Sequence, residues 1–199
     1  MKFIKKPLIL ILKFLLLIIG FCAALWIFLP WREVGGAAVS LARPMLEQRG
    51  VRLNFAGVRS QSGEQGFTID GLEIGGMMNF NFDSLTIQPQ ILDSLMNFAP
   101  VCSIRFRGGS MTMGQKINFG DGSLLLTASP NNILIERLRT NGDFAVNGFI
   151  AVDPAKARIS RAEASLSVPQ EFEGNMQTLQ NFLPLVKDKN GNWFLRRTQ

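Results

Sequence analysis

The stretch GFTIDGLEIGG, residues 66–76, contains two short alternating apolar runs that are out of phase with each other. The apolar residues occupy odd positions up to Ile69 and even positions from Leu72 onward. Because strand side chains alternate between two faces, a slip of one residue moves the apolar set to the opposite face. The stretch is therefore either a turn at Asp70-Gly71 between two strands or one continuous strand with a bulge at Gly71.

The same kind of slip recurs elsewhere in the chain. In MNFNFDSLTI the apolar phase changes at Ser84, and in KARISRAEASLSV it changes near Arg161, without a strong turn pair at either place. We therefore favour one bulged strand over 66–76. Bulged strands bend and twist more than regular ones, so several of them side by side make a strongly curved sheet. Its concave face is either a closed core or an open groove, and the sequence leaves both open.

Residues 33–49 predict a short helix ahead of the first strand. Its expected apolar stripe consists of Ala38, Leu41, Met45 and Leu46, and Gly50 is a stop signal. Pro44 predicts a kink or a helix start at that position.

From Val51 onward the apolar pattern predicts strands separated by turns. The pairs Gly108-Gly109, Asp121-Gly122 and Asn141-Gly142 are typical of hairpin turns. A helical turn is expected at 89–97, a helix near 171–184, and a last strand in GNWFLRR. The sequence thus predicts a mainly β protein, an antiparallel meander of about nine or ten short strands curved into a groove or half-barrel, with short flanking helices.

The segment PLILILKFLLLIIGFCAALWIFL, residues 7–29, predicts a transmembrane helix. At about 1.5 Å per residue it spans about 35 Å, enough for a hydrocarbon core of about 30 Å. Its candidate anchor residues are Leu8, Leu16, Ile19, Trp26 and Trp31. The lysines before it favour a cytoplasmic N-terminus. A cleaved signal peptide is the competing interpretation, and a lipoprotein site at Cys22 is disfavoured by the bulky Phe21.

Three regions follow from this pattern. Residues 1–30 form a cytoplasmic tip and transmembrane anchor, residues 31–50 a linking helix, and residues 51–199 a β domain on the far side of the membrane. For a bacterial inner membrane, that side is the periplasm.

Composition argues against several classes of function. The chain has no His and no Tyr, which removes the commonest general base and metal ligand. A nucleophile at Ser123 would lack a His to activate it. We expect no catalytic residues, no metal and no cofactor. The net charge of +6 reflects four lysines within the first 13 residues, and the scattered charges of the rest argue against nucleic-acid binding.

The chain contains 16 Phe and 8 Met but no Tyr. This composition fits either a core built of Phe or an apolar surface for acyl chains or a partner, because Met adapts to irregular ligands. Cys102, on an apolar strand face, is expected to be a small core residue. The candidate groove or partner surface comprises Phe67, Ile69, Leu72, Ile74, Phe80, Phe82, Ile104, Phe106, Met111 and Met113.

The order of motifs resembles a known family. The chain presents FLPW (28–31), GVRLNF (50–55), GFTIDGLEI (66–74) and the closing stretch LQNFLPLVKDKNGNWFLRR (179–197). This order is similar to the short form of the type II secretion system protein N family, which is related in outline to AsmA-like groove proteins.

The resemblance implies an inner-membrane anchor carrying a periplasmic β domain, and a non-enzymatic accessory role in secretion. The expected partners are the membrane and secretion-system or envelope subunits. The alternative is an AsmA-like lipid-binding or lipid-transfer protein that carries phospholipid acyl chains on its concave face.

Overall fold

The computed structural model of the chain describes residues 13–14, 16–18, 20–21, 24, 28–60, 65–76, 79–113, 115–156, 158–174, 176, 180, 184–189 and 192–197. Most of the predicted transmembrane segment, including Leu8, Ile19 and Trp26, lies outside these residues. Among the residues described, no helix combines the length and the apolar character needed to cross a membrane. The transmembrane helix over 7–29 therefore stays a prediction.

The described elements are a long helix, a short helix, a 3-10 turn and eleven strands. In chain order they are α2 (Trp31–Glu47), β1 (Arg52–Asn54), β2 (Gly57–Arg59), β3 (Phe67–Gly75), β4 (Asn79–Pro89), α3 (Ile91–Asn97), β5 (Val101–Met113), β6 (Gln115–Ser129), β7 (Asn132–Thr140), β8 (Ala145–Asp153), β9 (Arg158–Ser167), η1 (Gln170–Phe172), β10 (Leu185–Lys187) and β11 (Trp193–Arg197).

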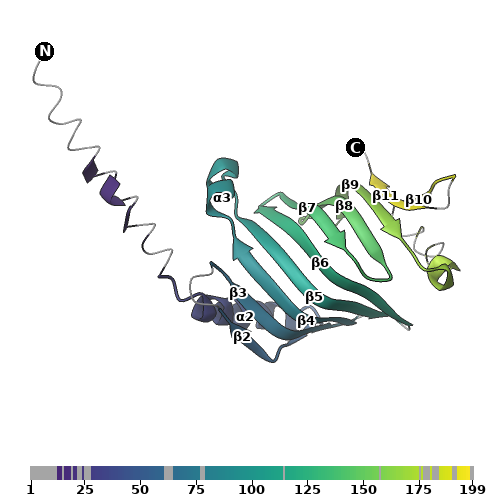
Figure 1. The fold of residues 1–199 in the computed structure, drawn as a ribbon, viewed down its shortest axis with the longest axis horizontal. Helices are drawn as coiled ribbons and strands as arrows, with labels where there is room; N and C mark the ends of the chain where they lie inside the picture. The colour runs from purple at the N-terminus through teal and green to yellow at the C-terminus, as the bar shows by residue number, and fades with distance from the viewer. Residues whose placement is uncertain are drawn as a thin grey trace, which may run out of the picture.

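All of the described strands belong to a single antiparallel sheet (Figure 1). Its order is β1-β3-β4-β5-β6-β7-β8-β9-β11-β10, with β2 also paired to β3, and its two ends do not meet. The order follows the chain except at β2 and the final β10-β11 hairpin, as expected for a meander. The prediction of a mainly β, open antiparallel sheet is confirmed.

The stretch around Gly71 is one continuous strand, as favoured from the sequence. Gly71 has a φ of +58°, a conformation that glycine adopts without steric cost. Leu72 pairs with Phe82 and Ile69 pairs with Leu85, so β3 and β4 change phase together at the same level. The change in β4 is the slip predicted at Ser84, and β4 runs through it without a turn. Both strands therefore keep their apolar residues on one face.

Two predicted hairpins are wrong, because the chain passes through them as bent strands. β5 continues across Gly108-Gly109 and β6 continues across Asp121-Gly122. The positive φ of Gly108 and Gly120 serves a bulge here, and the pairing of β5 with β6 shifts register at this level. Asp121 Oδ1 accepts a hydrogen bond from the Gly108 N–H, and Asn118 Oδ1 accepts one from the Gly120 N–H. Side chains thus satisfy backbone groups that the bulges release from the ladder.

Other local predictions are confirmed. The turn at Asn141-Gly142 separates β7 from β8, the helical turn within 89–97 is α3, and the closing strand is β11. Near 171–184 the structure describes η1 followed by helical residues at 173–174 and 176, and the rest of that predicted helix lies largely outside the described residues.

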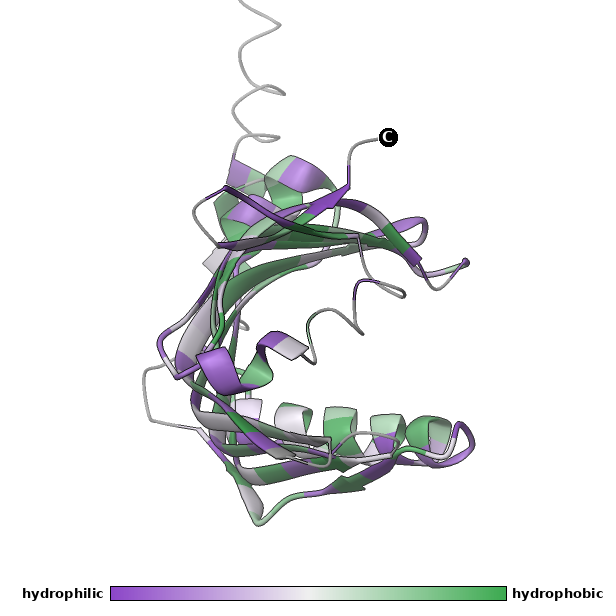
Figure 2. Ribbon diagram, turned by 90° about the vertical axis from the view of Figure 1, so that its right-hand side faces the viewer, coloured by the Kyte–Doolittle hydropathy of each residue, from purple (hydrophilic) through white to green (hydrophobic). Residues whose placement is uncertain are grey.

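The bulges line up into a band that crosses the sheet. Register places Gly71 opposite Asp83 and Asp83 opposite Gly108, while Gly109 pairs with Gly120. Further irregularities follow in β7 and β8, where the pairing shifts between Ile135 and Leu138. Each strand bends as it crosses this band, and the sheet takes a C-shaped cross-section (Figure 2). The curved sheet inferred from the slips is what the structure shows.

Helix α2 packs on the concave face of the sheet at its β1–β3 end (Figure 2). Its predicted apolar stripe is wrong at three positions, because Leu41 and Met45 are 71% and 70% exposed and Ala38 is exposed as well. Leu46, the fourth predicted residue, is half-buried and packs against the core as expected. The buried side contains Trp31, Gly35 and Val39. Gly35 selects this side, because a residue without a side chain brings the helix close to the ring of Phe67. Helix periodicity alone does not reveal that a glycine marks the contact.

A matched pair of substitutions tests this contact. A Cβ on Gly35 would lie 2.5 Å from ring carbons of Phe67, whereas a Cβ on Gly36 would meet nothing within 4 Å. Gly36→Ala is expected to raise the free energy of unfolding by about 0.5–1 kcal/mol through helix propensity. Gly35→Ala is expected to lower it, because overpacking costs about 1–3 kcal/mol. Thermal unfolding of the two variants checks the signs, and equal stabilisation by both would show that α2 is loosely seated.

Candidate functional site

The concave face carries an apolar surface that extends across the sheet. Antiparallel partners share a face, so Phe67 and Ile87, then Ile104 and Leu124, follow one another from β3 to β6. The surface continues through β7 and β8 to Leu195 on β11. Because β3 to β7 change phase at the bulges, their apolar residues on both sides of the band point the same way.

The two ends of this surface are covered. At one end α2 packs over a buried cluster of Val39, Leu53, Phe67, Ile69 and Leu72. At the other end Met176 completes a buried cluster with Ala162, Ala164, Leu185, Trp193 and Leu195. Lys187 Nζ lies 5.5 Å from the centre of the Trp193 ring. These two clusters are the hydrophobic core of the molecule.

The middle of the surface, on β5, β6 and β7, belongs to neither buried cluster. Its apolar side chains are half-buried rather than enclosed; the described ones are Ile104, Met111, Ile117, Leu124, Leu126, Ile133 and Ile135. Phe106 is buried by comparison, edge-to-face with Phe82 at 5.4 Å between ring centres. We call this set, without Phe106, the concave apolar surface.

The predicted groove residues are placed on one face, with different degrees of cover. Phe67, Ile69 and Leu72 are buried beneath α2, and Ile74 and Phe82 pack against the same cluster. Phe80, Ile104 and Met111 are half-buried nearer the middle. Met113 ends β5, and its side chain lies outside the described part of the chain. Of the predicted anchor residues, Leu16 is exposed, whereas Trp31 is buried at the start of α2. Whether the groove residues bind anything stays a prediction.

Sequence reasoning missed the contribution of β6 and β7 to this surface. The sequence-based candidates do not include Leu124, Leu126, Ile133 or Ile135, because the sequence predicts a turn at Asp121-Gly122. The signal was the alternation of Leu124 and Leu126 immediately after Gly122, which is typical of a strand that continues.

The convex face is polar along β2 to β5. Thr68 and Thr86 share a hydrogen bond of 2.9 Å between their hydroxyls, and Arg59 Nε lies 2.9 Å from Asp70 Oδ2. Arg105 donates to Gln88 Oε1 at 3.1 Å. In this part the sheet therefore separates a polar outer face from an apolar inner face, as expected when one face is solvated.

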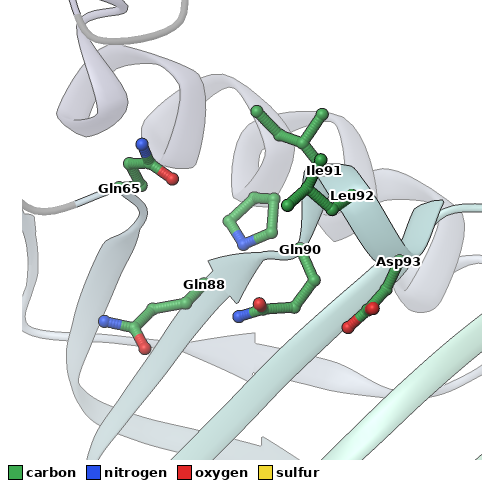
Figure 3. Close-up of a pocket in the computed structure, with 7 residues that line it drawn as sticks. Gln65, Gln88, Gln90, Ile91, Leu92 and Asp93 are labelled. Atoms are coloured by element: carbon green, nitrogen blue, oxygen red, sulfur yellow. The ribbon is translucent and has the colours of Figure 1, made fainter. Parts of the chain in front are cut away.

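Two pockets adjoin α3 at the rim of the sheet. The larger, about 650 Å³, is lined by the amides of Gln65, Gln88 and Gln90, by Asp93 and by Ile91 and Leu92 (Figure 3). The other, about 440 Å³, is largely apolar; its lining includes Ile91, Leu95, Phe98 and Cys102. Burial raises the pKa of the Cys102 thiol, which keeps it protonated at neutral pH. No group of three acidic, Cys or His side chains able to hold a metal ion occurs among the described residues.

Comparison with known protein families identifies a match over nearly the whole chain. A model of the family described as type II secretion system protein GspN-like, Synergistales, matches residues 9–197. Neither curated proteins nor solved structures provide a significant match to the chain.

Proposed function

Because the chain belongs to the GspN-like family of type II secretion system proteins, we propose that it is a non-enzymatic accessory component of that machine. Residues 7–29 anchor it in the inner membrane with a cytoplasmic N-terminus, and residues 51–199 form its periplasmic β domain. The observation that carries this proposal is the family match, which covers residues 9–197 and therefore most of the apolar segment and the whole sheet. Its work is contact with other secretion subunits.

The open sheet offers two places for such contacts. One is the outer edge of β10, a strand of three residues whose Val186 is exposed. An unpaired edge can accept a strand from a partner through backbone hydrogen bonds. The other place is the concave apolar surface, which a partner segment could cover.

Co-purification from native membranes tests the proposal. The full chain, tagged at its C-terminus and solubilised mildly, is expected to bring down other subunits of the secretion system. Loss of its gene is expected to reduce secretion of type II substrates. A chain that brings down no such subunit, and whose loss leaves secretion unchanged, would contradict the proposed role.

The concave apolar surface favours a second candidate, phospholipid binding. A curved sheet with a half-exposed apolar inner face and a polar outer face can accommodate acyl chains without exposing them to water. Organic extraction of the purified chain distinguishes the two candidates. Phospholipid retained in stoichiometric amount supports lipid binding, whereas its absence together with bound secretion subunits supports an assembly role alone.

A further inference from the structure

Helix α3 and the residue after it form an apolar projection at the rim of the sheet. Leu92, Leu95, Met96 and Phe98 are between 66% and 97% exposed, with Phe98 the most exposed of them. The projection joins the ends of β4 and β5 and stands above the sheet (Figure 1). Soluble proteins rarely expose several large apolar side chains together unless the patch binds something.

The projection is held rigidly. Ser94 Oγ accepts a hydrogen bond of 2.9 Å from the Val101 N–H and donates one of 2.6 Å to the Gln90 carbonyl. Val101 is 1% exposed, so this link is anchored in the most buried part of the sheet rim. Phe98 caps the helix with a left-handed φ of +49°, which directs the chain back toward β5. The apolar side chains are therefore presented on a fixed support.

The projection is also continuous with the concave apolar surface. The apolar pocket beneath α3 is lined by Leu95 and Phe98 on one side and by Cys102 on the other. Cys102 pairs with Leu126, which belongs to the concave apolar surface. An unbroken apolar path thus leads from the tip of the projection to the inner face of the sheet.

From these features we propose that α3 and Phe98 dock into the lipid bilayer in which the chain is anchored. This inference rests on the proposed function, because it takes residues 7–29 to be membrane-embedded. The described pieces of residues 13–24 rise on the same side of the molecule as α3 (Figure 1). Their side chains Phe14, Leu16 and Phe21 are exposed. A tether makes insertion intramolecular, so a small apolar tip suffices.

The chemistry of the projection formed by α3 and Phe98 favours a bilayer over a charged partner. Its exposed apolar side chains are called the tip. The four exposed side chains are aliphatic or aromatic, and the only charged residue of α3 is Asp93. Polar groups lie immediately beneath: Gln65, Gln88 and Gln90 line the neighbouring pocket (Figure 3). An apolar tip above a polar belt of three amides and the Asp93 carboxylate fits the step from acyl chains to headgroups.

Photocrosslinking of the full chain in bilayer nanodiscs of phosphatidylethanolamine and phosphatidylglycerol tests the docking. Benzoylphenylalanine is placed at position 98, at position 16 within the anchor, or at position 186 as an exposed apolar control on β10. Lipid adducts detected by mass spectrometry are expected at 98 and 16 but not at 186. Lipid adducts at position 16 without adducts at position 98 would contradict the docking of α3 but not the membrane anchor. Absence of lipid adducts at both positions would contradict the anchor as well. In whole cells, a protein adduct at 98 in place of lipid overturns the choice of partner.

Phe98→Asn provides a variant that preserves the fold. Asn is among the residues that tolerate a left-handed φ, and the ring of Phe98 is 97% exposed, so the melting temperature is expected to stay unchanged. Lipid adducts from a probe at position 96 are expected to fall several-fold in this variant. An unchanged adduct yield at position 96 would show that the Phe98 ring does not help to hold the tip in the bilayer, contrary to the proposal.

Discussion

Gly148→Ala is expected to destabilise the sheet by about 3 kcal/mol or more, a large part of the stability of a typical domain. Gly148 has a φ of +155°, and a Cβ there would lie 2.2 Å from the carbonyl oxygen of Glu163 and 2.4 Å from the Cα of Ala164. These atoms are backbone of the neighbouring strand β9, which cannot move without breaking its pairing. Alanine at position 148 therefore both strains the backbone of β8 and pushes it away from β9.

Gly57→Ala on β2 is the matched control for this experiment. Gly57 is also a strand glycine, but a Cβ there would meet nothing within 4 Å. The free energy of unfolding of the Gly57→Ala variant is expected to stay within about 0.5 kcal/mol of that of the parent protein. Chemical denaturation of both variants in the same detergent gives the comparison. Similar midpoints for the two would mean that β8 and β9 are not packed as closely as the structure shows.

Ile135→Glu is expected to remove retained phospholipid from the purified chain, if the concave apolar surface holds acyl chains. Ile135 lies at the middle of that surface, paired with Leu126 on one side and Ile150 on the other. A carboxylate among acyl chains would be buried without a partner, which is strongly unfavourable. Retained lipid is expected to fall about tenfold or more, equivalent to about 1.4 kcal/mol in binding.

Leu134→Glu is the control, because Leu134 precedes Ile135 on the same strand, is also half-buried and faces the convex side. Lipid that merely surrounds the N-terminal segment is common to both variants and cancels in the comparison. Equal lipid loss in both variants, or in neither, would argue against acyl chains on the concave face. Thermal unfolding of the two proteins verifies that they remain folded.

The sequence predicts the class of this fold well because its main signals are local. Alternation identifies the strands, and the phase slip at Gly71 without room for a hairpin identifies a bulge. The failures at Gly108-Gly109 and Asp121-Gly122 have a physical cause. A glycine-rich stretch suits a tight turn and a bulge equally, here with positive φ at Gly108 and Gly120, and only the neighbouring strand decides between them. That neighbour is distant in sequence, so the decision is not local.

The candidate surface was only partly predictable for the same reason. The sequence places the candidate residues of β3, β4 and β5 on one face, but a predicted turn at Asp121-Gly122 hides the contribution of β6 and β7. The sequence does not predict the exposure of Leu92 and Phe98, since a short apolar helix usually packs against a neighbour. Alternation predicts which face a side chain occupies, and it does not predict whether another element covers that face.

The aligned bulges have a consequence for how proteins of this design can vary in size. Every strand from β3 to β6 bends at the same level, so the cross-section of the sheet is set strand by strand, independently of how many strands there are. Inserting a bent hairpin between two neighbouring strands would lengthen the concave channel of the sheet without changing its width or depth. The number of strands and the shape of the cross-section are thus separate variables, and a longer relative would be built by repeating a shared bent unit.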